Sequence, residues 1–382
     1  MTHYDAIVVG VGGMGSAVVH HLARRGLRVL GLERYDIPNE MGSSHGVTRM
    51  IRLAYQEHPS YVPLMLRAYQ LWHQLENETG QQLLITTGSI LAGTETSSMF
   101  QGSKEACDIH HLPYQVLTGP EVNQRFPGYQ LPEDILAVYQ ADGGFLLSEQ
   151  CIVAHVSRAL DLGAEVHGRE QMVHWEPSGE GVKVQTDKGS YSASRLVVCA
   201  GAWASKLVPM LTDYAVPERQ VLAWFQPIQP DMFRPGSFPV WVLEADEGVH
   251  YGFPSYGIPG FKVGRYHHLR QQVDPDQMDR EPNQRDEEVL REFTRRYFPQ
   301  AAGPTLALKT CLFTNTPDEH FILDVHPEFP QIFIAAGFSG HGFKFCSVVG
   351  EIMADLSQHG ETRHDLSLFR LDRFQKERPP VV

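Results

Sequence analysis

Three glycines near the start of the chain have the spacing of a dinucleotide-binding turn. Gly10, Gly12 and Gly15 fit the pattern G-x-G-x-x-G. Because glycine has no side chain, this spacing allows a tight turn, a pyrophosphate close to the backbone, and a helix packed hard against a strand. Glu33 follows eighteen residues after Gly15, where a carboxylate can accept hydrogen bonds from both hydroxyls of an adenosine ribose. A 2′-phosphate on that ribose would be repelled.

The segments around these glycines are the ones that such a turn requires. Residues 6–9 form a short apolar run, which is typical of a parallel strand buried on both faces. An amphipathic helix is predicted next, with Gly26 as its C-terminal cap, and residues 27–32 predict a second strand that ends at Glu33. A lone G-x-G-x-x-G can also be a simple turn between a strand and a helix. Since strand, helix, second strand and acid occur in order, we predict dinucleotide binding, although the motif does not distinguish NAD from FAD.

Two arginines follow a polar, glycine-containing loop. Arg49 and Arg52 are three residues apart and would share one face if residues 48–55 were helical. Two arginines on one face of an acidic protein predict an anion site. The alternative is a pair of solvated surface charges, which is common for such doublets.

The rest of the chain divides into two kinds of sequence. Apolar runs that end in glycine, at residues 196–201 and 332–337, continue the α/β pattern, so a parallel sheet begun at residue 5 is completed near residue 335. Residues 216–310 are rich in proline and aromatic residues and predict short strands of a mixed or antiparallel sheet, whereas residues 97–130 predict helices and turns. We therefore expect a discontinuous nucleotide-binding domain (1–84, 146–215 and 318–382) and a substrate domain (85–145 and 216–317).

Composition limits the classes of function. The chain has 382 residues, of which 42% are hydrophobic, and 32 Lys and Arg against 45 Asp and Glu give a net charge of −13, which argues against nucleic-acid or anionic-membrane partners. No apolar run is long enough to span a bilayer and no leader segment is visible, so we expect a cytoplasmic protein without a membrane partner. Five scattered cysteines without a C-x-x-C pair indicate a reducing compartment and no structural metal site.

Four separated motifs carry a more specific resemblance. They are Gly42–Arg49 (GSSHGVTR), Tyr251–Pro254 (YGFP), Cys311 with Asn315–Glu319 (NTPDE), and Gly337–Lys344 (GFSGHGFK). In this order, and over nearly the whole chain, they resemble the monomeric sarcosine oxidase and N-methyltryptophan oxidase family of FAD-dependent amine oxidases, which also includes pipecolate oxidase. The resemblance implies FAD as the cofactor. It also implies an α/β fold (α+β overall), with a Rossmann-like FAD-binding domain of the glutathione-reductase type and a second, mixed or antiparallel substrate domain.

The resemblance implies roles around the flavin. Cys311 matches the cysteine that binds FAD covalently through its thioether, although read alone it would be one more buried thiol. His45 and Arg49 match residues beside the isoalloxazine, where positive charge stabilises the reduced, anionic flavin. Lys262 matches the lysine associated with oxygen activation, whereas its apolar flanks alone would suggest a side chain that reaches to solvent.

The resemblance also implies a substrate site. Arg52 and Lys344 match the pair that holds the substrate carboxylate, the arginine through two parallel donors and the lysine as a point charge. Tyr251 matches an active-site tyrosine. An active-site histidine corresponds to His267 or His268, because this chain has one extra residue after the conserved lysine position; we take His267 as the first choice.

Some positions depart from the commoner pattern of the family. Ser44 and Val47 replace a histidine and an aspartate, and Phe313 replaces the tyrosine of sarcosine oxidase. His341 is interpreted as a structural histidine that packs the glycine turn around it. These departures concern the substrate side chain more than the redox chemistry.

We accordingly expect a monomeric oxidase of N-methyl (secondary) amino acids that uses O2. Sarcosine is the first choice, with glycine, formaldehyde and H2O2 as products, and N-methyl-L-tryptophan and L-pipecolate are the alternatives. A second hypothesis is a dehydrogenase that passes electrons to a carrier instead of O2. A non-catalytic flavin-binding subunit of a complex is a third, which the joint presence of Arg52, Lys262, Cys311 and Lys344 disfavours.

Overall fold

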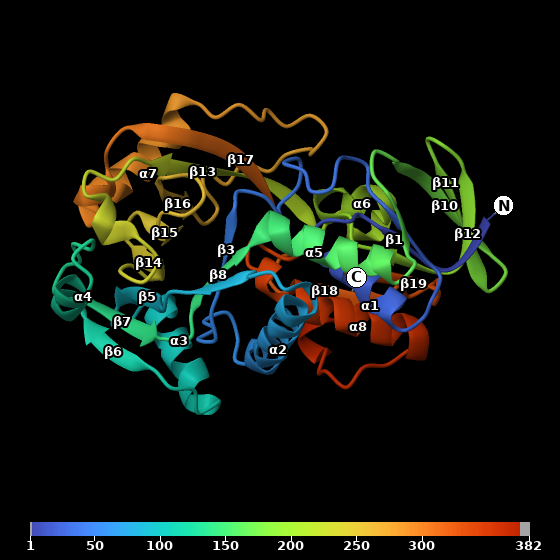
Figure 1. The fold of residues 1–382 in the computed structure, drawn as a ribbon, viewed down its shortest axis with the longest axis horizontal. Coiled ribbons are helices and arrows are strands. Elements are labelled where there is room, and N and C mark those ends of the chain that lie inside the picture. The colour runs from blue at the N-terminus through green and yellow to red at the C-terminus, as the bar shows by residue number, and fades with distance from the viewer. Residues whose placement is uncertain (1, 375–382) are drawn as a thin grey trace, which may run out of the picture.

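The computed structural model describes residues 2–374 and contains two large sheets beside each other, with helices packed on both (Figure 1). The first sheet has eight strands in the order β10-β11-β12-β1-β2-β9, with β19 paired to β12 and β18 to β19. Its central strand pairs, β1 with β2 and β12, β2 with β9, and β12 with β19, are parallel. The strands are β1 (Thr2–Val9), β2 (Val29–Leu32), β9 (Glu165–His167), β10 (Met172–Ser178), β11 (Gly181–Thr186), β12 (Ser190–Val198), β18 (Ile322–Val325) and β19 (Ile332–Ala336).

Helices cover this parallel sheet because their apolar faces need burial. The helix α1 (Gly13–Arg24) follows the glycine loop and packs between α5 (Ser148–Asp161) and α8 (Cys346–His359). The approach of α1 to α8 is close at Gly350, where an added Cβ would lie 2.8 Å from Ala17. The longest helix, α2 (Tyr61–Thr79), also contacts α8 and ends at Gly80, which adopts the left-handed conformation that favours glycine.

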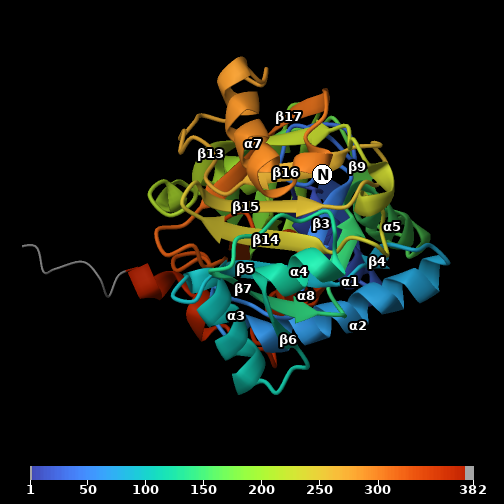
Figure 2. The ribbon, with the colours of Figure 1, turned by 90° about the vertical axis from the view of Figure 1, so that its left-hand side faces the viewer.

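The second sheet is mixed and has the strand order β17-β13-β16-β15-β14-β5-β7-β6. Its pairs are antiparallel except for the parallel pair of β14 with β5. Figure 2 shows this sheet with α7 (Gln284–Tyr297) at one end and α3 (Ser98–Ile109) at the other. The strands are β5 (Ser89–Thr94), β6 (Gln115–Thr118), β7 (Ile135–Gln140), β13 (Val216–Phe225), β14 (Val240–Ala245), β15 (Gly248–Phe253), β16 (Phe261–Arg265) and β17 (Thr305–Asn315); the short helices are α4 (Gly119–Arg125) and α6 (Ala204–Leu207).

A small three-stranded sheet lies between the two large ones (Figure 1). Its order is β3-β8-β4, with β3 (Thr48–Ile51) and β4 (Leu84–Thr86) both antiparallel to β8 (Gly144–Leu147). The prediction that residues 48–55 could be helical is therefore wrong, because β3 pairs with a strand almost one hundred residues further along the chain. The segment beyond it, with Arg52, is irregular.

The predicted fold class is confirmed. A Rossmann-like sheet with parallel central strands stands beside a second, mixed sheet, as expected. The strands β6 and β7 were not predicted, since Val116 of β6 is exposed and neither strand shows a clean alternation of apolar and polar residues. Among residues 2–374, none of the helices is long and apolar enough to cross a membrane.

Candidate active site

Two adjoining cavities lie where the two large sheets meet. The first cavity is lined by the glycine loop, including Gly10 and Gly12, and by Glu33 at the end of β2. The second cavity is lined by predicted site residues from β3 and the irregular segment after it, from β15 and β17, and from the turn before α8, namely Arg49, Arg52, Tyr251, Cys311 and Lys344. Ser43, Ser44 and Gly201 line both cavities. One elongated molecule can therefore occupy the two cavities together.

The glycine loop leaves backbone surface free in the first cavity. An added Cβ at Gly12 would meet nothing within 4 Å, whereas one at Gly15 would lie 1.7 Å from the Gly10 carbonyl oxygen. Gly10 has a φ of +88°, which side chains disfavour. The loop thus offers open space for a pyrophosphate at Gly12 and requires glycine at the other two positions, in agreement with the dinucleotide-binding motif.

Glu33 is placed to accept hydrogen bonds at the far end of the first cavity. Its two carboxylate oxygens accept hydrogen bonds from the backbone N–H groups of Val11 (2.9 Å) and Tyr35 (3.0 Å). Burial raises the pKa of Glu33, although these backbone donors act in the opposite direction. Because each carboxylate oxygen has two lone pairs, acceptor capacity remains for ribose hydroxyls.

The first cavity has a further wall that the sequence did not reveal. Asp276, from the segment between β16 and α7, lines this cavity. Its carboxylate accepts hydrogen bonds from Arg34 (2.6 Å), Trp203 (2.8 Å) and Lys206 (2.5 Å). The loop from the mixed sheet is thereby tied to two segments of the parallel sheet. No local motif marks Asp276, and only the pairing across the two sheets identifies it.

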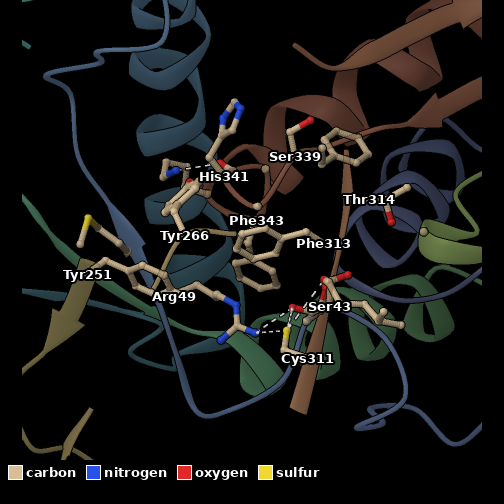
Figure 3. A pocket seen from close by; sticks show the side chains of 18 of the residues that line it. Ser43, Arg49, Tyr251, Tyr266, Cys311, Phe313, Thr314, Ser339, His341 and Phe343 are labelled. Atoms are coloured by element: carbon tan, nitrogen blue, oxygen red, sulfur yellow. Dashed lines mark hydrogen bonds between the residues drawn. The ribbon is translucent and has the colours of Figure 1, made fainter. Parts of the chain in front are cut away.

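Cys311 and Arg49 meet in the second cavity (Figure 3). The Arg49 Nη2 atom lies 3.7 Å from the Cys311 Sγ atom and donates a hydrogen bond to the Ser43 carbonyl oxygen at 2.7 Å. Cys311 is buried on β17 and faces the loop that separates the cavities. A thiol beside a fixed cation is the environment that a nucleophilic cysteine needs.

His45 and Lys262 lie buried next to this loop but line neither of the two cavities. Neither ring nitrogen of His45 has a hydrogen-bond partner among the described residues, and burial lowers the pKa of this histidine to about 3. Lys262 does not reach solvent as its apolar flanks suggested. Its Nζ donates to the carbonyl oxygens of Gly46 (2.8 Å) and Thr48 (2.7 Å), and burial holds its pKa well below the usual range.

Arg52 extends into the second cavity from the irregular segment after β3. It is 3% exposed, donates to the Ala54 carbonyl oxygen, and contacts Gln56 and the Glu57 carboxylate at 3.2 Å. Burial, the largest single contribution, would raise the pKa of Glu57, but the charge of Arg52 and the smaller contributions of His341 and Lys344 together outweigh it and lower that pKa to about 2. An arginine held this way is charged and has its guanidinium at the cavity wall.

Lys344 contributes the second cation of the same cavity. It lies in a short 3₁₀ turn, Phe343–Phe345, and its Nζ donates to the His341 carbonyl oxygen at 2.7 Å. Burial, reinforced by the positive charge of Arg52, lowers its pKa to about 7. The structure therefore brings the predicted carboxylate-binding pair together, although the two residues are separated by almost three hundred positions in the chain.

The structure does not bring the predicted histidine to this cavity. His267 has a positive φ of 52° and bonds to Glu218 (3.1 Å) and Glu319 (3.2 Å), and His268 bonds to the buried Asp286 (2.9 Å). Neither lines the second cavity. Tyr266, which precedes them, does so beside Tyr251 (Figure 3), with ring centroids 5.7 Å apart.

Tyr266 is thus a cavity residue that sequence reasoning missed. The strand β16 ends at Arg265, and the chain then turns so that the tyrosine points inward and the two histidines point away. The extra residue after the lysine position was the available signal, and its effect on the register of the turn was not resolved from the sequence. Tyr266 is the third aromatic side chain on this part of the cavity, with Tyr251 and Phe313.

The fold and the paired cavities define a flavin-dependent oxidoreductase. A family model described as "FAD dependent oxidoreductase" matches residues 5–356, and the chain belongs to this family. Within it, the chain is 42% identical to the monomeric sarcosine oxidase of Bacillus sp. (strain NS-129), over 97% of each chain. It is 33% identical to the N-methyl-L-tryptophan oxidase of Yersinia pestis (strain Pestoides F), over 97% of this chain and 100% of that one.

Solved structures agree with this placement. NikD, an unusual amino acid oxidase essential for nikkomycin biosynthesis, superposes with a TM-score of 0.85 at 25% identity and covers 97% of this chain and 98% of its own. The expected family and the expected FAD cofactor are confirmed. The open surface at Gly12, the acceptor Glu33 and the residues shared by both cavities, Ser43, Ser44 and Gly201, fit FAD across the two cavities. The individual roles of the site residues stay predictions.

Proposed function

We propose that the protein is a monomeric oxidase of N-methyl amino acids, with sarcosine as its preferred substrate. Sarcosine, O2 and water would yield glycine, formaldehyde and hydrogen peroxide. The observation that carries this proposal is the pair of buried cations, Arg52 and Lys344, in a cavity that adjoins the nucleotide-binding cavity. The names of relatives that are 42% and 43% identical to this chain support the choice of substrate.

The cations would orient the substrate by its carboxylate. Arg52 can offer two parallel N–H donors, and Lys344, from the C-terminal part of the chain, adds a compact positive charge. Their positive charge also disfavours a protonated substrate amine, so the neutral amine that the oxidation needs is favoured in the cavity. The rings of Tyr251 and Tyr266 form part of the wall and limit access of water.

When bound, FAD would supply the two-electron acceptor for the amine, with O2 as the proposed final acceptor. Cys311 would hold the flavin covalently through a thioether, with the Arg49 guanidinium beside the sulfur. Lys262, fixed by two carbonyl oxygens and the Thr48 hydroxyl, would stand beside the flavin and assist the reduction of O2.

A second candidate substrate class is that of cyclic and aromatic secondary amino acids. It is favoured by the aromatic wall of the cavity, where Phe313 replaces a tyrosine and Tyr266 takes the place expected for a histidine. L-Pipecolate and N-methyl-L-tryptophan represent this class, and the 33% identical N-methyl-L-tryptophan oxidase supports it.

Peroxide release under air tests the proposal. The purified flavoprotein would be assayed with sarcosine, N-methyl-L-tryptophan, L-pipecolate and L-proline. We expect the largest kcat/KM with sarcosine. A larger value with pipecolate or N-methyltryptophan would select the second class, and absence of peroxide from all four would overturn the oxidase proposal. Reduction of the flavin without peroxide would instead indicate a dehydrogenase.

A further inference from the structure

Tyr55 lies between the two cations of the second cavity. Its side chain is fully buried, and the Arg52 guanidinium carbon lies 4.6 Å from the ring centroid, with the Lys344 Nζ at 5.2 Å. The hydroxyl oxygen is 2.7 Å from the His341 Nδ1 atom and 3.5 Å from the Lys344 Nζ atom. One tyrosine therefore contacts both groups that would bind the substrate carboxylate.

The hydrogen-bond partners fix the direction of these bonds. The His341 Nε2 atom is 2.9 Å from the Glu319 carbonyl oxygen, which can only accept, so Nε2 carries the hydrogen. Burial lowers the pKa of His341 to about 4, so the ring is neutral and its Nδ1 is an acceptor. The Tyr55 hydroxyl must then donate to Nδ1, and its own oxygen lone pairs are left to accept from Lys344.

This arrangement accounts for the donors of Lys344. An ammonium group has three N–H donors. One points to the His341 carbonyl oxygen at 2.7 Å and a second to the Tyr55 hydroxyl, so a single donor remains for a carboxylate in the cavity. The hydrogen-bond geometry thus determines where that remaining donor can point.

We propose that Tyr55 and His341 form a positioning pair, which holds the Lys344 ammonium group in its charged form and directs its remaining donor at the substrate carboxylate. The inference rests on the proposed function, since it concerns the same carboxylate site. It gives His341 a role beyond packing the glycine turn. Neither Tyr55 nor His341 transfers a proton to or from the substrate.

The charges around Lys344 explain why such a pair is needed. Burial and the charge of Arg52 disfavour the ammonium form, whereas Glu57 and, more weakly, the thiol of Cys346 favour it, which leaves the pKa at about 7. A group with this pKa loses its charge easily near neutral pH. Because the Tyr55 oxygen accepts from the charged form, its removal should lower the pKa of Lys344 further.

The proposal can be tested by the binding of acetate to the holoenzyme. Binding is measured through the change in visible absorption of the flavin, between about pH 6 and about pH 9. Acetate has a carboxylate but no oxidisable amine, and acetamide serves as its uncharged control. In the wild-type protein, affinity for acetate should fall as the pH rises through about 7, because Lys344 loses its charge. In Tyr55→Phe we expect this fall to begin at least about half a pH unit lower and acetate to bind roughly tenfold more weakly near pH 7.

Tyr61→Phe is the matched control. It removes the hydroxyl of a buried tyrosine whose ring centroid lies 4.7 Å from that of Tyr55, but this hydroxyl contacts His320 at 3.2 Å rather than Lys344. Acetate binding and its pH profile should stay as in the wild type. An equal shift in Tyr61→Phe and Tyr55→Phe would indicate a general packing effect and overturn the proposal.

If Tyr55→Phe does not fold, a second pair of variants tests the same proposal. In His341→Asn the side-chain oxygen can accept from Tyr55 as Nδ1 does, whereas His341→Leu offers no acceptor. We expect the asparagine variant to keep most of the wild-type acetate profile and the leucine variant to lose it. Equal profiles in both would overturn the positioning pair. If the wild-type protein bound no acetate and released no peroxide, the proposed function itself would fail.

Discussion

The Arg49 guanidinium lies 3.7 Å from the sulfur of Cys311, across a boundary between two sheets and more than 250 residues of sequence. Arg49 is anchored on β3 by bonds to the Ser43 and Thr48 carbonyl oxygens, so its position does not depend on the cysteine. A thiol placed beside an independently fixed cation is suited to attack an electron-poor ring.

Cys311→Ser should yield a protein whose flavin is not covalently bound. After acid precipitation, the wild-type protein should leave its yellow colour in the pellet and the variant should release it to the supernatant. Cys107→Ala is the control, because Cys107 is buried on α3 and lines neither cavity, and its pellet should stay yellow. A yellow pellet from Cys311→Ser would show that another residue forms the link.

Lys262→Met should slow reoxidation of the flavin by O2 far more than its reduction by substrate. We expect a loss of roughly 10- to 100-fold in the oxidative half-reaction, because the buried lysine that the resemblance assigns to oxygen activation is removed. Stopped-flow absorbance separates the two half-reactions. Lys309→Met, on β17 with Glu40 as its partner, changes a lysine of the same sheet and should alter neither rate. Equal losses in both half-reactions would contradict the assignment of Lys262.

The glycines of the loop should differ in what they tolerate. Gly15→Ala places a Cβ within 1.7 Å of the Gly10 carbonyl oxygen, so the apoprotein should lose roughly 1–3 kcal/mol of stability. Gly12→Ala meets no atom within 4 Å, so the apoprotein should unfold as the wild type does. Its methyl group would instead occupy space for the pyrophosphate, and the flavin content should fall. Apoprotein melting and flavin absorbance distinguish the two effects, and equal melting losses would contradict this prediction.

His267 should make the stability depend on pH. Hydrogen bonds to Glu218 and Glu319 raise its pKa from 6.5 to about 9. Since the folded-state pKa is raised, its stabilisation is complete below about pH 6.5 and is lost as the pH rises through about 9. Because the side chain is partly exposed, we expect roughly 1–2 kcal/mol. Denaturant titrations of His267→Gln should lack this dependence, whereas His73→Gln, on the exposed face of α2, should retain it. If the free energy of unfolding of His267→Gln kept the same pH dependence, other groups would be responsible for it.

Local sequence was sufficient for the glycine loop, because a strand, a turn and a helix that follow one another in the chain determine its geometry. It was not sufficient for Arg52, whose position depends on the pairing of β3 with β8. Lys262 shows the same limit. Its apolar neighbours suggested a lysine side chain that reaches to solvent, but β16 lies between β13 and β15, so the side chain is enclosed and its Nζ atom donates to carbonyl oxygens.

The contrast between Tyr266 and His267 has a different origin. Both residues follow β16, and a single residue more or less in the turn decides which of them faces the cavity. The chain turns after Arg265, and His267 has a positive φ of 52°, so neighbouring side chains point in different directions and a resemblance that is correct to within one position can name the wrong neighbour. The motifs were therefore sufficient to predict where the cavity lies, but the local backbone conformation determines which side chains line it.

The loop that contains Ser43 and Ser44 is shared by both cavities, and this has a consequence for how such enzymes can diversify. A change in that loop would disturb cofactor anchoring and substrate chemistry at the same time. The wall formed by Val242, Tyr251, Tyr266 and Phe313 belongs to the second cavity only. New substrate preferences can therefore arise by single substitutions in that wall, which leave the glycine loop and Glu33 of the first cavity unchanged.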